Sequence, residues 1–130
     1  MLTILVGAVA LFAFGALWFT VLFGKTWARL MNFTPEQNAS MEKSMKKPLL
    51  VNFFLNVLIA VVVFYIFQAV GHTSFGEFIK VVLFVWLGFS FPIYANQALW
   101  EAKSWNLVLL NSAQGIISFI IVASVVYFMQ

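Results

Sequence analysis

The chain has 130 residues, of which 64% are hydrophobic and 8% are charged, and its mean hydropathy is +1.02. A soluble domain carries about 25% charged residues, so this composition excludes a soluble enzyme or binding module and predicts an integral membrane protein. The chain contains no cysteine, which excludes disulfides, thiolate nucleophiles and cysteine-based metal sites.

Four apolar stretches follow one another along the chain. Lys80 is the one charged residue within them, and they cover residues 2–23, 49–70, 78–99 and 105–129. A helix of roughly 20 apolar residues crosses the roughly 30 Å hydrocarbon core of a bilayer. Strands of a membrane barrel would alternate apolar and polar residues, and these stretches do not. We therefore predict a single transmembrane domain, residues 1–130, of the all-α class, with helices at about 2–24, 49–70, 77–99 and 104–129.

The positions of the basic residues predict how the spans are oriented. An even number of spans places both termini and the connection 71–74 on one side of the membrane, and the segment 25–48 and the turn 101–104 on the other. Basic residues gather on the cytoplasmic side of short-loop membrane proteins. Lys80 alone lies on the side of the termini, whereas the other side carries Lys25, Arg29, Lys43, Lys46, Lys47 and Lys103. We therefore expect an antiparallel up-down four-helix bundle in a bacterial inner membrane, with both termini outside. The net charge of +3 marks this topology and not a nucleic-acid-binding face.

The cytoplasmic segment 25–48 contains a helix-start signal. Thr34 is suited to be the N-cap, Pro35 the first helical residue, and Gln37 the third residue after the cap. Pro48 prevents this helix from continuing directly into the second span. Two interpretations are open: a short helix on the inner membrane surface, or a solvated charged linker.

Polar side chains within the spans gather in the cytoplasmic halves of the helices. They are Thr20, Asn52, Asn56, Asn96, Gln97, Asn111 and Gln114. An amide that faces hydrocarbon is costly, so these residues should point into the bundle. They either form hydrogen bonds between helices, or line a vestibule that binds a polar molecule or a lipid headgroup. The spans contain no Asp or Glu, which argues against a proton- or cation-coupled pump.

Three further features predict how the helices pack and end. Pro92 should kink the third span. Gly7 and Gly15 lie on nearly the same face of the first helix and allow close helix packing, within the bundle or between protomers. Lys80 is placed to pair with Glu77 at the membrane boundary.

Two blocks of sequence carry a family resemblance. Residues 14–27 read FGALWFTVLFGKTW, and the later block reads WLGF at 86–89 and NQALWE at 96–101. The residues that carry the pattern are Gly15, Trp18, Thr20, Phe23, Gly24, Trp27, Gly88, Asn96, Trp100 and Glu101. The chain resembles, over essentially its whole length, the bacterial four-helix membrane family catalogued as domain of unknown function 1761. It departs from the pattern at Val21, where Pro is frequent, and at Trp100, where Phe is usual. The resemblance implies a four-span fold and no established activity.

Two functions fit these observations. The first is a small membrane protein that binds or transports a polar solute or a lipid through the amide-lined vestibule. The second is a structural or accessory subunit that packs against other membrane proteins. No nucleophile–base pair, phosphate-binding loop, metal cluster or carboxylate pair is visible in the sequence, so we expect no enzyme, metal or cofactor. The expected partners are the lipid bilayer and either a second copy of the chain or another membrane protein.

Overall fold

The structure is a computed structural model that describes residues 1–43, 46–71 and 73–129. Every element in these ranges is a helix: α1 (Leu2–Leu17), the π-helix η1 (Trp18–Leu22), α2 (Gly24–Leu30), α3 (Pro35–Lys43), α4 (Lys46–Val70), α5 (Phe75–Phe89), α6 (Phe91–Trp100) and α7 (Trp105–Phe128). Four helical stretches are long and apolar enough to cross a membrane, namely Leu2–Leu22, Lys46–Val70, Phe75–Trp100 and Trp105–Phe128. The predicted all-helical class and the four apolar spans are therefore confirmed.

The first span is broken near its end, where one helix over residues 2–24 was predicted. In η1 the Phe23 N–H donates to the Trp18 carbonyl at 2.8 Å, one residue further back than in an α-helix. The Thr20 hydroxyl donates to the Ala16 carbonyl, an arrangement that often bends helices. Phe23 then leaves the helical conformation (φ −131°, ψ 18°), and α2 begins at Gly24. The span therefore ends in a π-turn followed by a break, and such irregularities frequently lie at functional sites.

The third span is broken by its proline. α5 ends at Phe89, and Pro92 lies in the first turn of α6. Proline cannot donate a backbone hydrogen bond, and its ring clashes with the carbonyl four residues earlier. Between the two helices, the Ser90 carbonyl accepts the N–H groups of Ile93 (3.2 Å) and Tyr94 (3.3 Å). The predicted kink is thus present as a break at Ser90.

The segment between the first two spans contains the predicted helix. The Thr34 N–H donates to Gln37 Oε1 at 2.8 Å, and the Gln37 N–H donates to Thr34 Oγ1 at 3.1 Å. This reciprocal pair is the capping box that the sequence predicted at the start of α3. The next helix, α4, begins at Lys46, so Pro48 lies in its first turn, where a missing N–H is tolerated.

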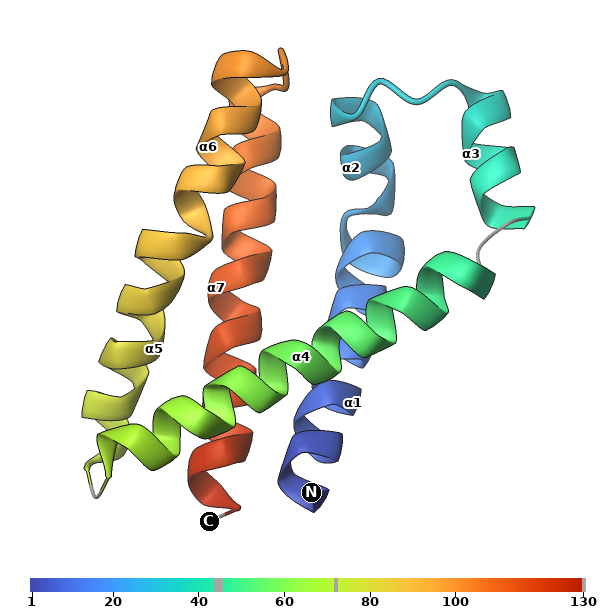
Figure 1. The fold of residues 1–130 in the computed structure, drawn as a ribbon. Coiled ribbons are helices and arrows are strands. Elements are labelled where there is room, and N and C mark those ends of the chain that lie inside the picture. The colour runs from blue at the N-terminus through green and yellow to red at the C-terminus, as the bar shows by residue number, and fades with distance from the viewer. Residues whose placement is uncertain (44–45, 72, 130) are drawn as a thin grey trace.

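The helices are arranged around α7. This helix contacts α1, α2, α4, α5 and α6. Figure 1 shows α1 and α2 on one side of α7, α5 and α6 on the other, and α4 running obliquely across them. Both chain termini and the end of α4 lie at one end of the molecule, here called the terminal end. The turn from α6 to α7 and the helix α2 lie at the opposite end, called the loop end.

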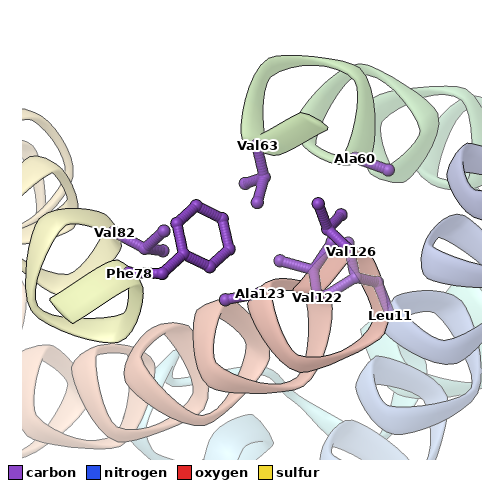
Figure 2. Close-up of a cluster of buried hydrophobic side chains, with 8 residues drawn as sticks. All are labelled: Leu11, Ala60, Val63, Phe78, Val82, Val122, Ala123 and Val126. Atoms are coloured by element: carbon purple, nitrogen blue, oxygen red, sulfur yellow. The ribbon is translucent and has the colours of Figure 1, made fainter. Parts of the chain in front are cut away.

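The most tightly packed core lies toward the terminal end. Figure 2 shows its buried side chains, which come from α1, α4, α5 and α7: Leu11, Ala60, Val63, Phe78, Val82, Val122, Ala123 and Val126. A Cβ placed on Gly7 would lie 3.3 Å from the Val122 side chain and 3.4 Å from the Ala60 Cβ. Gly7 therefore allows α1, α4 and α7 to approach closely, as predicted for this position of the first helix.

Polar contacts hold the connection into α5 at the terminal end. The Tyr127 hydroxyl donates to the Thr73 carbonyl at 3.0 Å and so ties α7 to this connection. Ser74 caps α5 by accepting the Glu77 N–H at 3.2 Å. Lys80 Nζ lies 3.4 Å from Glu77 Oε1, and both side chains are exposed. This is the ion pair predicted at the membrane boundary.

Candidate functional site

The seven polar residues predicted to line a vestibule lie on η1, α4, α6 and α7. None of the seven, all of which are described, is fully buried. Three of them, Thr20, Asn52 and Asn96, are exposed, whereas Asn56, Gln97, Asn111 and Gln114 are half-buried.

Two hydrogen bonds between side chains involve these seven residues, and each runs within a single helix. Asn56 Nδ2 donates to Asn52 Oδ1 at 3.1 Å in α4. Gln114 Nε2 donates to Ser118 Oγ at 2.8 Å in α7. Gln114 also reaches α1, because a Cβ placed on Gly15 would lie 3.9 Å from its Nε2. The convergence of all seven residues on one vestibule and their bonding between helices both stay predictions.

A cavity of about 430 Å³ lies between the first span and α7. One wall comes from η1, α2 and the break between them, and the other from the first turns of α7. The lining residues are Trp18, Phe23, Thr26, Arg29 and Leu30 on the first wall, and Asn106, Leu109, Leu110 and Ala113 on the second. None of the seven predicted vestibule residues, all of them described, is part of this lining. The cavity is here called the α2–α7 cavity.

The break in the first span forms one wall of this cavity. It lies within the first family block, residues 14–27, whose side chains pack around it. The buried indole of Trp18 packs on the Phe23 ring, with ring centroids 4.4 Å apart. A Cβ placed on Gly24 would lie 3.0 Å from the Phe19 carbonyl oxygen, so glycine allows α2 to start this close to η1. Trp27 packs edge-on against Phe19, with centroids 5.6 Å apart. The block therefore holds α2 in place, and three of its residues, Trp18, Phe23 and Thr26, line the cavity.

The polar residues of the lining lie toward the loop end on both walls. On α7, Asn106 lies in the first turn, and the apolar lining residues follow it down to Ala113 over about 10 Å of helix. On the other wall, Arg29 and the apolar Leu30 lie in the last turn of α2, and Trp18 lies at the start of η1. The cavity thus has a polar mouth toward the loop end, formed by Thr26, Arg29 and Asn106, and an apolar floor at Trp18 and Ala113.

The second family block lies elsewhere on the surface. Asn96, Trp100 and Glu101 are exposed, and nothing lies within 4 Å of a Cβ placed on Gly88. Trp86 is the exception in this region, since its indole is buried against Gly115 of α7. The structure therefore brings the first block to the cavity and leaves most of the second block on the outer surface of α5 and α6.

Most of the cavity lining was not identified from the sequence. Arg29 was interpreted only as a topology signal, and Asn106 lies near a predicted helix start. A usable signal exists: in a helix that begins at Gly24, Thr26 and Arg29 are three residues apart and share a face. Asn106 and Ala113 are likewise two turns apart on one face of α7. Side-chain donors at the mouth and apolar surface at the floor suit the binding of an amphipathic molecule.

Comparison with known proteins identifies the family. No curated protein and no solved structure matches the chain. The model of the family described as protein of unknown function (DUF1761) matches residues 2–127. That range includes the first three spans, the fourth span up to Tyr127, both family blocks and the whole lining of the α2–α7 cavity. The chain therefore belongs to the DUF1761 family of proteins of unknown function.

Proposed function

We propose that this protein binds a lipid, or another amphipathic molecule with a polar headgroup, in the α2–α7 cavity. The observation that carries the proposal is that Arg29 and Asn106 lie at the loop end of the two walls, whereas Ala113 and the buried Trp18 lie at their other end. An amphipathic ligand would place its headgroup among the donors and its chain against the apolar residues. The proposed role is binding, without catalysis.

We propose the membrane orientation from the distribution of basic residues. The chain would cross a bacterial inner membrane four times in up-down order, with both termini outside and α2 and α3 at the cytoplasmic face. The mouth of the cavity would then open at the headgroup level of the cytoplasmic leaflet. A lipid could enter from that leaflet without leaving the membrane.

The contrast between the two halves of the bundle supports this role. The buried core of Figure 2 lies toward the terminal end, whereas the cavity lies between α2 and the first turns of α7, toward the loop end. Gln114 directly follows Ala113 of the cavity floor and lies close to Gly15 of α1. A small polar solute that passed the floor would therefore meet the predicted amide vestibule next, which is the route by which binding would extend to transport.

Native mass spectrometry of protein released from lipid nanodiscs tests the binding proposal. Ala113→Phe fills the floor of the cavity and should reduce the fraction of protein that retains a lipid. Ala13→Phe adds the same volume at an exposed position of α1 outside the lining and should leave lipid retention unchanged. Equal retention by the two folded variants and the unmodified protein would refute the proposal.

A second candidate role, packing against another copy of the chain, rests on the first half of α4. Its exposed face carries Val51, Leu55 and Leu58, and Asn52 is exposed beside them. Asparagine both donates and accepts hydrogen bonds, and an amide facing lipid is unfavourable. Two copies related by a twofold axis along the membrane normal would place their Asn52 side chains at equal depth. Each amide could then form hydrogen bonds with the other.

Cysteine cross-linking tests this second role, because the chain has no native cysteine. Leu55→Cys should form a disulfide-linked dimer in oxidised membranes. Phe84→Cys places the thiol on the exposed surface of α5 and should remain monomeric. Equal cross-linking at both positions would indicate random collision and contradict a dimer. Cross-linking to a different protein would show that this face of α4 packs against an accessory partner and not against a second copy.

A further inference from the structure

The mouth of the α2–α7 cavity carries a positive charge that no carboxylate of the lining balances. Arg29 lines the mouth, and the lining contains no Asp or Glu. The ion pair found among the described side chains is Lys80 with Glu77, at the terminal end. The guanidinium of Arg29 is therefore not paired with any carboxylate whose side chain is described. Arginine presents several N–H donors in a fixed planar array that fits phosphate and carboxylate groups.

The backbone around Arg29 leaves its side chain available for a ligand. α2 ends with the Asn32 N–H donating to the Arg29 carbonyl at 3.1 Å and the Phe33 N–H donating to the Ala28 carbonyl at 3.1 Å. Asn32 has a left-handed conformation (φ 60°), and together these features form a Schellman cap. Because backbone N–H groups satisfy these carbonyls, the Arg29 side chain is not needed to cap its own helix.

The opposite wall contributes neutral donors and a favourable helix end. The Asn106 side chain lines the mouth from the first turn of α7. Its N–H is capped by Ser104 Oγ at 3.0 Å, and the N-terminal end of a long helix carries partial positive charge. Thr26 supplies a hydroxyl on the α2 wall. The field and the donors at the mouth thus all favour an anion.

We infer that the α2–α7 cavity selects an amphipathic ligand whose headgroup bears a phosphate or carboxylate, with Arg29 as the residue that binds the anion. This inference rests on the proposed function and adds the charge of the headgroup to it. We infer an acyl chain on the ligand because the floor is lined by Trp18, Leu110 and Ala113. A small hydrated anion would leave this apolar surface uncovered.

A competition between two lipids tests the inference. The protein is placed in nanodiscs of phosphatidylglycerol and phosphatidylcholine in equal amounts with identical acyl chains, released, and weighed with its retained lipid. We expect the unmodified protein to retain the anionic lipid in preference by about fivefold, the scale of an ion pair at an exposed site. Arg29→Gln should lower this ratio to about one, and Arg29→Lys should keep most of it.

Lys25→Gln is the matched control, because it removes the same charge from an exposed position of the same helix outside the lining. It should leave the ratio unchanged, whereas an equal fall with Lys25→Gln would reveal a general surface charge effect and overturn the inference. An unmodified protein without preference overturns it even if Arg29→Gln does not fold. Retention of inorganic phosphate from a phosphate buffer, without lipid, would assign the mouth to a free anion and overturn the requirement for a chain.

The two proposals fail in different ways. If Ala113→Phe abolishes retention of both lipids but their ratio is one in the unmodified protein, the cavity binds lipid and the selection of anions is wrong. If Ala113→Phe leaves retention unchanged, the cavity is not the lipid site and the proposed function fails, whatever the ratio.

Discussion

The contact between Trp86 and Gly115 predicts that Gly115→Ala destabilises the bundle. A Cβ placed on Gly115 would lie 2.5 Å from Trp86 Nε1, 3.1 Å from Cε2 and 3.3 Å from Cζ2. Trp86 is only 4% exposed, so its ring cannot turn away into open space. Overpacking of this kind costs about 1–3 kcal/mol, and replacing a helical glycine by alanine recovers about 0.5–1 kcal/mol. We therefore expect a net loss of roughly 1–2 kcal/mol in the free energy of unfolding.

Gly88 supplies the matched control on the helix that carries Trp86. Nothing lies within 4 Å of a Cβ placed there, so Gly88→Ala should stabilise the protein by about 0.5–1 kcal/mol through helix propensity alone. Both variants are unfolded by titration with sodium dodecyl sulfate in mixed micelles, and helix content is followed by circular dichroism. Unfolding free energies that do not differ between the two variants would refute the reasoning.

A double-mutant cycle separates the ring contact from other effects of Gly115→Ala. Trp86→Leu removes the ring atoms that the new methyl group would strike. In that background, Gly115→Ala should lose its penalty and become neutral or mildly stabilising, which gives a coupling energy of roughly 1–3 kcal/mol. A penalty that persists without the indole would place its cause elsewhere on α7.

Three other predictions follow from single contacts and from the proposed orientation. Tyr127→Phe removes the hydroxyl that donates to the Thr73 carbonyl at 3.0 Å and should cost about 1 kcal/mol in the same titration; an unchanged midpoint would show that this bond is not maintained in micelles. Ala102 has a left-handed backbone (φ 54°), which costs a residue with a Cβ about 1–2 kcal/mol, so Ala102→Gly should stabilise the turn from α6 to α7, and destabilisation would contradict that conformation. In intact cells, an impermeant maleimide should label Ser74→Cys and spare Ser40→Cys until the membrane is opened, and the reverse pattern would invert the proposed orientation.

The features that could be predicted from the sequence are those set by local chemistry. The spans follow from apolar length, the break before Pro92 follows from a missing N–H group, and the start of α3 follows from the spacing of Thr34 and Gln37. Each of these signals depends on residues within about one turn of one another or on the composition of a stretch. Tertiary packing does not determine these features, so their positions in the structure agree closely with those predicted from the sequence.

The features that were missed depend on backbone hydrogen bonding that composition does not determine, or on contacts between distant segments. The π-turn at η1 requires the shifted hydrogen bond from Phe23 to Trp18, and apolar composition is the same for α and π windings. The oblique course of α4 depends on packing at Gly7 and Ala60, because tilt is set by neighbouring helices and not by span length. The cavity needs both of its walls, and nothing local pairs Arg29 with Asn106.

The irregular first span connects these missed features with the proposed function. A straight first helix would continue the α-helical winding past residue 18 and would not place Thr26 and Arg29 on the present wall. Hydrophobicity alone marks this segment as the end of a span. Because of the break, the segment instead forms one wall of the cavity, with Arg29 at its mouth. Gly24 permits the close approach that this break requires, with its Cβ position 3.0 Å from the Phe19 carbonyl oxygen. Under the proposed function, the first family block builds one wall of the binding site, because its glycine and aromatic residues hold the break that places Arg29.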